Sequence, residues 1–376
     1  MPFRRRGWLQ SGTALAVAGC VRSPDRRAGI VAYPARSLIY APLLVAQQHG
    51  LYAAPPVHVV PLLRSGGRQV AAEVASGKAD AGALPLADFL EAAAAGAPLV
   101  TFGALTRRFG GQLVVSATAA FPREVGALLS GEWRAAPVGL QTGSGGSEQM
   151  MRFWWLAEGP TPLAPLPTGE GGTPAAASAK SGLPSPLVGA GGRFPLLISD
   201  PLAGEPRWIG YGTSEGLVAA LKDHRIDAFL GHSQAAAQAA ILGGADIIAS
   251  FSDGSVAPDV SSTLGTVLVA RRERLAGRNP AGDQFMHALV RGCARAAATL
   301  VGPDGPAAAS RALPERDPLT LGLALRLDAP AESQSIYALD GRLDPEAIGR
   351  YLQLAALAGH THDVEPAALI TDRYTD

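Results

Sequence analysis

Apolar positions along residues 29–102 follow a regular alternation of strand and helix patterns. Short runs rich in Val, Ile and aromatic residues, such as 29–33 and 99–102, predict buried strands. Stretches with helical spacing separate these runs, and Ser37 stands where it can cap the first helix, 38–49. Strands separated by helices of this length predict parallel βαβ units, so this part of the chain indicates an α/β fold. The other elements expected here are strands at 57–60 and 79–84 and helices at 69–76 and 86–95.

The same alternation returns around a glycine-rich loop. An apolar strand at 137–141 runs into the loop and then into a helix that contains Trp154 and Trp155. Glycines let the backbone approach a ligand closely, and the first turn of a helix offers free N–H groups and a positive dipole end. The loop therefore predicts a cradle for an anion or polar ligand, and the alternative is an ordinary helix cap. The proposed cradle residues are Thr142, Gly143, Ser144, Gly145 and Gly146.

Residues 159–205 interrupt the pattern, because they are rich in Pro, Gly and Ala and lack periodicity. We expect an insertion whose centre, 169–192, is dispensable for folding and binding, with a short edge strand within 194–198. Strands at 207–211 and 226–230 and helices at 216–223 and 283–300 follow. A further strand at 262–270 is expected to close the second lobe.

The N-terminus has the features of an export signal. Three arginines, Arg4, Arg5 and Arg6, precede a short apolar run, and Val17-Ala-Gly-Cys20 closes it. The run is too short to span a bilayer, and its end resembles the lipobox of bacterial lipoproteins. We therefore expect a signal peptide at 1–19, lipidation of Cys20 and a tether at 20–28. The segment 5–10 also resembles a twin-arginine signal.

Charge and cysteine content narrow the function further. Removal of the three signal arginines leaves 29 basic residues against 32 acidic ones, a net charge near −3. Such a chain has no basic excess to attract nucleic acid. With Cys20 lipidated, Cys293 has no partner for an intrachain disulfide. A length of 376 residues can bury two medium-sized cores, which favours two lobes.

Several short segments together resemble a known family. Gly50-Leu-Tyr52, Val74-Ala-Ser-Gly-Lys-Ala-Asp80 and Ala95-Gly-Ala-Pro-Leu99 occur in the order and spacing of the first lobe of solute-binding proteins of ABC importers of the nitrate, sulfonate and taurine type. Further similar segments are Leu221-x-x-x-x-Ile226-Asp-Ala228 and the C-terminal helix at 345–358. Asp223-His-Arg225 departs from the family, which often has Gly there. The resemblance covers about 29–158 and 206–376.

This resemblance implies a two-lobed periplasmic binding protein type 2 fold, in which each lobe is a mostly parallel sheet flanked by helices. Lobe I would comprise 29–112 and 271–376, and lobe II 113–270. The implied function is capture of a small solute by a monomeric, lipid-anchored protein on the periplasmic side of the membrane, which delivers the solute to an ABC permease. No cofactor, metal or catalytic group is implied.

The resemblance also places the ligand between the lobes. By segment, it implies ligand contacts from Arg36, Ser37 and Tyr40, from Pro85 and Leu86, from the cradle at 142–146, and from His232 and Ser233. We expect a small anion, held by N–H groups around 143–147 and opposed by Arg36.

Other functions remain open at this point. Gly212-Thr-Ser214-Glu-Gly216 has the spelling of a hydrolase nucleophile elbow, with Asp246 or Asp253 and His287 as potential partners. The alternative is that Ser214 is the N-cap of the following helix and Glu215 lies in its first turn, which accounts for the same residues without catalysis. His360, His362 and Asp363 could ligate a metal. Thiamine-precursor binders and pyrimidine-synthesising enzymes share the scaffold, although their cysteine-rich signature is missing, and a sensor domain is a further alternative.

Overall fold

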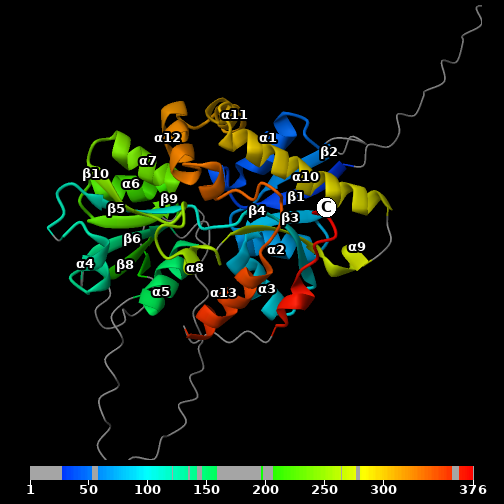
Figure 1. Cartoon of the computed structure of the whole chain (residues 1–376), viewed down its shortest axis with the longest axis horizontal. Coiled ribbons are helices and arrows are strands. Elements are labelled where there is room, and N and C mark those ends of the chain that lie inside the picture. The colour runs from blue at the N-terminus through cyan, green and yellow to red at the C-terminus, as the bar shows by residue number, and fades with distance from the viewer. Residues whose placement is uncertain are drawn as a thin grey trace, which may run out of the picture.

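The computed structural model describes residues 28–52, 58–120, 122–133, 136–141, 146–158, 196–197, 206–263, 265–276, 280–357 and 364–375. Within them the chain forms two sheets, and Figure 1 shows the two lobes side by side, each a sheet with helices on its faces. In each sheet most strands run in one direction. The expected α/β fold with two lobes is therefore confirmed.

The first sheet has five strands in the order β2-β1-β3-β11-β4. Its strands are β1 (Ala28–Tyr33), β2 (His58–Leu63), β3 (Ala81–Pro85), β4 (Leu99–Thr106) and β11 (Thr266–Arg271). All residues of β3 and β4 are buried, as expected for strands covered on both faces. The helices of this lobe are η1 (Leu38–Tyr40), α1 (Ala41–Gln48), α2 (Gly67–Ala75), α3 (Leu86–Ala94), α9 (Arg272–Ala276), α10 (Pro280–Val301), α11 (Gly305–Ala312), α12 (Pro318–Asp328), η2 (Glu332–Gln334), α13 (Pro345–Leu357) and η3 (Pro366–Leu369).

The second sheet has six strands in the order β10-β5-β9-β6-β8-β7. Its strands are β5 (Gly111–Ser116), β6 (Pro137–Gln141), β7 (Leu196–Leu197), β8 (Arg207–Tyr211), β9 (Ala228–His232) and β10 (Ala245–Ser250). The expected edge strand is present as β7, which pairs antiparallel with β8. The rest of the insertion lies outside the described residues. The helices of this lobe are α4 (Val125–Leu129), α5 (Ser147–Glu158), α6 (Ser214–Lys222), α7 (Ser233–Ile241) and α8 (Pro258–Ser261).

The strand expected at 262–270 is present, but the prediction that it closes the second lobe is wrong. It forms β11, which lies between β3 and β4 of the first sheet and pairs antiparallel with both, so it does not close the second lobe. Five of its six residues are buried. A strand that is apolar throughout is suited to the centre of either sheet, and only pairing along both of its edges decides which sheet receives it.

The helix expected at 38–49 begins with a short 3₁₀ turn, η1, before α1 starts at Ala41. Pro42 lies at the start of α1, where the missing N–H of proline is tolerated. Ser37 occupies the N-cap position of η1, but its side chain makes no capping hydrogen bond. The hydroxyl of Ser37 is therefore not used to begin the helix.

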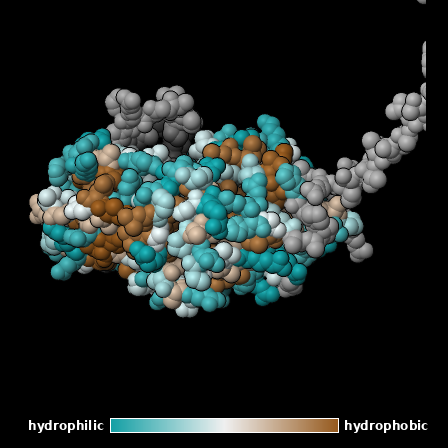
Figure 2. Space-filling view, turned by 90° about the horizontal axis from the view of Figure 1, so that it is seen from above, coloured by the Kyte–Doolittle hydropathy of each residue, from teal (hydrophilic) through white to brown (hydrophobic). Residues whose placement is uncertain are grey.

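Two C-terminal helices connect the lobes on opposite sides. In Figure 1, α12 lies beside α7 of the second lobe, whereas α13 lies between α3 and the α5–α8 region. The Tyr351 ring of α13 packs edge-on against Phe153 of α5, with 5.4 Å between the centroids. On the α12 side, apolar areas lie over each lobe with hydrophilic residues between them (Figure 2). Both lobes are therefore held by helices that follow β11 in the chain.

Candidate functional site

The candidate site is the border between the lobes, where strands of both sheets end. β1 and β3 end at Tyr33 and Pro85, and β6 and β9 end at Gln141 and His232. Ligands of open α/β sheets bind beyond the carboxyl ends of such strands. The backbone N–H of Leu38 donates to Gln234 Oε1 at 3.3 Å, which joins the first-lobe loop to the start of α7.

The first-lobe loop presents one hydroxyl and one paired cation. Ser37 Oγ is buried, and none of the described residues forms a hydrogen bond with it. Arg36 donates from Nε to Glu315 Oε1 at 2.9 Å and from Nη2 to the carbonyl of Ala312 at 3.1 Å. The charge of Arg36 is thus already matched by a carboxylate of its own lobe, so an anion would have to compete with Glu315.

Tyr40, Pro85 and Leu86 lie around the start of β11. The Tyr40 side chain is hydrogen-bonded to that of Thr266, and burial raises the pKa of Tyr40 well above its usual value. Thr266 is opposite Pro85 in the sheet, and the N–H of Leu86 donates to the carbonyl of Gly265 at 2.9 Å. The three predicted residues are thus brought together by β11, a strand that sequence reasoning placed in the other lobe.

The glycine-rich cradle lies mostly outside the described residues, since Thr142, Gly143, Ser144 and Gly145 are among those not described. Gly146 is described, and a Cβ there would lie 3.0 Å from the Phe109 ring. Ser147 begins α5, and its buried hydroxyl has no hydrogen-bond partner within the described part of the chain. Ser147 therefore presents a hydroxyl at the first turn of a twelve-residue helix.

His232 is held as a neutral imidazole. Its backbone N–H donates to Gln141 Oε1 at 2.9 Å, and its Nδ1 contacts the carbonyl of Gly110 at 3.1 Å. Because that carbonyl is an acceptor, Nδ1 carries the proton in the neutral ring. Burial lowers the pKa of His232 to about 4. His232 can thus supply hydrogen bonds at neutral pH, but no positive charge.

Ser233 belongs to a buried polar cluster at the junction of the lobes. Its hydroxyl donates to Asp328 Oδ1, as does that of Ser252 at 3.3 Å. Gln112 Nε2 donates to Ser252 Oγ at 2.9 Å and to Ser233 Oγ at 3.4 Å, while Gln112 Oε1 is buried and has no partner among the residues that the structure describes. Burial raises the pKa of Asp328 to about 7, against the hydroxyl donors, which lower it. Sequence reasoning missed Asp328, whose only local signal is a carboxyl at the end of an apolar helix.

Ser214 does not have the surroundings of a hydrolase nucleophile. Its hydroxyl accepts from Gln141 Nε2 at 3.2 Å. His287 instead packs against the Tyr374 ring at 5.0 Å, and Asp246 pairs with Arg123 at 2.7 Å. The capping alternative also needs correction, because the N-cap of α6 is Thr213, whose Oγ1 accepts from the N–H of Gly216 at 3.1 Å. Thr213 has the extended backbone that an N-cap requires, whereas Ser214 is already helical.

The described part of the chain contains no group of three or more His, Cys, Asp or Glu side chains that could hold a metal ion. His360, His362, Asp363 and Cys20 lie outside it. None of the described helices is both long and apolar enough to cross a membrane.

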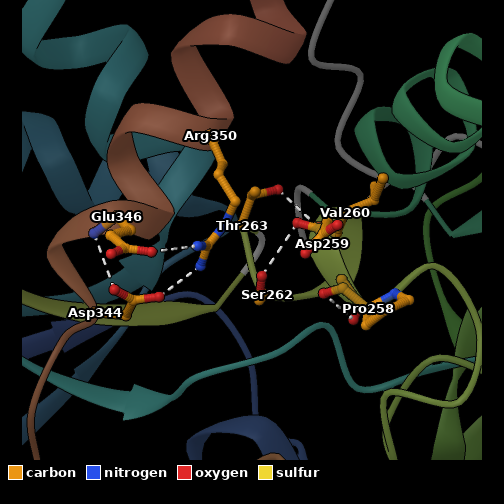
Figure 3. A network of polar contacts seen from close by, with 9 residues as sticks. Pro258, Asp259, Val260, Ser262, Thr263, Asp344, Glu346 and Arg350 are labelled. Carbon is orange, nitrogen blue, oxygen red and sulfur yellow. Dashed lines mark hydrogen bonds and ion pairs between the residues drawn. The ribbon is translucent and has the colours of Figure 1, made fainter.

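A charged cluster of Arg350, Asp344 and Glu346 lies where α13 meets the segment after α8. Figure 3 shows Arg350 extending from α13 between the carboxylates of Asp344 and Glu346 and the segment that carries Thr263. Arg350 donates to Glu346 Oε2 at 3.1 Å and to Asp344 Oδ2 at 2.5 Å. Thr263 in turn donates to the carbonyl of Val260 at 2.7 Å. Arg350, like Arg36, is therefore a cation matched by carboxylates, and it offers no free charge to an anion.

Comparisons with known proteins match one segment of the sequence and the fold. Residues 39–121 match the family described as NMT1/THI5 like. No curated protein matches the sequence. Among solved structures, the periplasmic aliphatic sulphonate-binding protein SsuA from Escherichia coli is similar, with 17% identity, a TM-score of 0.59, and coverage of 89% of this chain and 92% of SsuA.

Two further solved structures extend the likeness. The alkanesulfonate-binding protein SsuA from Xanthomonas axonopodis pv. citri, bound to MOPS, is 17% identical with a TM-score of 0.58, over 93% of this chain and 99% of that one. The periplasmic nitrate-binding protein NrtA from Synechocystis is 11% identical with a TM-score of 0.63, over 94% and 88%. The chain thus carries an NMT1/THI5-like segment at 39–121 and has the two-lobed fold of periplasmic solute-binding proteins of ABC importers.

Proposed function

We propose that this protein captures a small solute between its two lobes and delivers it to the membrane permease of an ABC importer. One observation carries the proposal: both lobes contribute buried polar atoms that have no hydrogen-bond partner among the described residues. They are Ser37 Oγ from the first lobe and Gln112 Oε1 and Ser147 Oγ from the second. Leaving a buried polar group unpaired costs about 1–3 kcal/mol, so a ligand that pairs with these groups gains binding energy.

We infer that the solute is a small anion or carries one anionic group. The first turn of α5 and the Ser147 hydroxyl offer donors without a cationic side chain. His232 is neutral, and Arg36 takes part only if it exchanges Glu315 for the ligand. The solved neighbours that bind sulfonate or nitrate support this class of ligand.

A second candidate ligand is a neutral pyrimidine-like heterocycle. The NMT1/THI5-like match at 39–121 favours it, as do the amide of Gln141 and the neutral imidazole of His232 beside the same strand ends. In this alternative the protein also binds and delivers its ligand without converting it. The neighbours, which are substrate-binding components of transport systems, support a non-enzymatic function in both cases.

The proposed location is the periplasmic side of the cytoplasmic membrane, with lipidated Cys20 as the anchor of a monomeric protein. The motif Val17-Ala-Gly-Cys20 motivates this proposal. We expect the Cys20→Ser variant to leave the membrane fraction when cells are fractionated. Retention of that variant in the membrane pellet at the wild-type level would contradict lipid anchoring.

The ligand can be identified by mass spectrometry of small molecules released from natively purified protein, followed by a thermal-shift panel of nitrate, sulfonates, taurine and pyrimidines. A ligand at about 100 times its Kd stabilises the protein by about 2.7 kcal/mol, which raises the midpoint by several degrees. Ser147→Ala should weaken the identified ligand about tenfold, whereas the exposed control Ser76→Ala should leave affinity unchanged. Equal ligand affinity in both variants would show that the Ser147 hydroxyl does not bind the ligand.

A further inference from the structure

A groove outside the candidate site lies between α2 and α3 of the first lobe. It has a volume of 540 Å³, and six of its ten lining residues are alanines: Ala71, Ala72 and Ala75 on α2, Ala92 on α3, and Ala95 and Ala97 in the segment after α3. Sites for small molecules commonly have volumes of about 300–1,000 Å³ and mostly apolar walls. The α2–α3 groove therefore has the size and lining of a small-molecule site.

One carboxyl group opens into this otherwise apolar groove. Asp88 lines it, is only 9% exposed, and accepts no hydrogen bond from the described part of the chain. A Cβ at Gly67 would lie 2.0 Å from Asp88 Oδ2, so the absence of a side chain at Gly67 makes room for the carboxyl. The side chain is thus held nine-tenths buried with its carboxyl facing the groove, and a carboxyl that the described residues leave without a hydrogen-bond donor can receive one from a ligand there.

Above about pH 7, where the Asp88 carboxyl is ionised, the charges around it give the groove a net negative charge. Arg68 on α2 pairs with Glu91 on α3 at 3.0 Å, which leaves the Asp88 carboxylate in excess. The other titratable groups that face Asp88 are Tyr40 and Tyr351, which are neutral because burial raises the pKa of each. Burial and the charge of Glu91 raise the pKa of Asp88 to about 7, whereas Arg68 lowers it.

We propose that the α2–α3 groove binds a small organic cation, with its ammonium group on Asp88 and its hydrocarbon body against the alanines. A single positive charge balances the excess carboxylate, and the apolar walls favour a compact alkyl or cycloalkyl body. The lining residues belong to α2, α3 and the turn that follows α3, and none of them is among the residues named for the interlobe site. The proposed cation is therefore a second ligand, distinct from the solute proposed for the cleft.

Titration calorimetry with cyclohexylammonium tests the proposal at about pH 8.5, where the Asp88 carboxyl is ionised. Cyclohexanol and cyclohexanecarboxylate provide the same body without the positive charge. We expect cyclohexylammonium to bind saturably at millimolar concentration and at least tenfold more tightly than either control. Because Asp88 must be ionised, its binding should weaken when the pH falls below about 7.

Two variants and one control complete the test. Asp88→Asn keeps the shape of the side chain and should weaken cyclohexylammonium at least tenfold, and Ala92→Leu should block the groove. Glu332→Gln removes an exposed carboxylate from η2 and should bind as the wild type does. The proposal is overturned if the wild type does not bind cyclohexylammonium, if cyclohexanol binds equally well, or if both groove variants keep wild-type affinity.

Discussion

Asp88 and Asp328 are two buried carboxyl groups with similar burial and different surroundings. Each lies on a helix of the first lobe, and burial raises the pKa of each to about 7. Asp328 accepts hydroxyl hydrogen bonds from Ser233 and Ser252 of the second lobe, whereas Asp88 accepts none from the described residues. Burial alone therefore does not define the role of a carboxyl group. Its hydrogen-bond partners assign Asp328 to holding the lobes together and leave Asp88 available to a ligand.

The largest effect expected from this comparison is on the pH dependence of stability. The folded protein keeps a proton on each carboxyl up to about pH 7, whereas the unfolded chain loses it near the ordinary pKa of 3.8. The stabilisation is therefore complete below about pH 4 and is lost as the pH rises to about 7. A shift of about 3 pKa units corresponds to at most about 4 kcal/mol for each group. Urea unfolding from pH 4 to pH 8 measures it.

Asp88→Asn and Asp328→Asn should each flatten this pH profile, since neither amide titrates in that range. An unchanged slope in both variants would mean that neither carboxyl carries the raised pKa. Asn also offers an acceptor oxygen to the hydroxyls of Ser233 and Ser252. Asp328→Asn therefore removes the titratable charge and keeps an acceptor for both hydrogen bonds.

The next effect is on stability at constant pH. Asp328→Ala leaves the hydroxyls of Ser233 and Ser252 without their acceptor, and should lower the free energy of unfolding at pH 7 by about 3 kcal/mol. Asp88→Ala breaks no hydrogen bond between described residues and should change it by less than about 1 kcal/mol or increase it. Urea unfolding of the two variants side by side measures the difference. Equal losses would contradict the distinction between the two carboxyl groups.

A smaller effect is expected when two buried hydroxyls are compared in the same way. Ser147→Ala removes a hydroxyl that has no partner among the described residues, so it should weaken binding of the solute about tenfold and change stability little. Ser233→Ala removes a donor to Asp328 and should cost about 1 kcal/mol of stability. Ligand titration and thermal melting of both variants provide the two measurements. The assignment would be wrong if Ser147→Ala lost stability and kept its affinity.

The smallest effect concerns an exposed contact between the lobes. Arg316, between α11 and α12, forms an ion pair with Glu215 of α6, and both side chains are a third or more exposed. Exposed pairs contribute about 0–1 kcal/mol, far less than the buried junction at Asp328. A double-mutant cycle with Arg316→Gln and Glu215→Gln should give a coupling below about 1 kcal/mol that shrinks further in high salt. A larger, salt-independent coupling would make this pair part of the junction.

Local patterns were sufficient to predict most elements of the fold. The strand and helix periods predicted β1, β3, β6, β8 and β9 together with α1, α2, α3, α5 and α6, because these periods depend on neighbouring residues alone. The short edge strand β7 was also expected from its apolar run. Gly50 follows α1 with a φ of 62°, the conformation that glycine adopts most easily at a helix end.

The candidate site could be predicted only by segment. In the structure, the loop after β1 contacts α7, and Pro85 at the end of β3 pairs with β11. The residues of these segments have different roles: the Ser37 hydroxyl has no partner among the described residues, Arg36 is bound to Glu315, and Ser233 is bound to Asp328. Glu315 lies 279 residues from Arg36 in the sequence, and Asp328 lies 95 residues from Ser233. No local sequence pattern predicts contacts between residues so far apart.

The sequence by itself thus determined which segments become strands and helices, where glycine-rich loops follow strands, and which side chains are apolar enough to be buried. The tertiary structure decided which sheet receives β11, which carboxyl meets a hydroxyl, and which cation is already neutralised. The physical reason is that secondary structure follows from the spacing of nearby side chains, whereas hydrogen-bond partners and burial depend on segments that meet only after the lobes have packed.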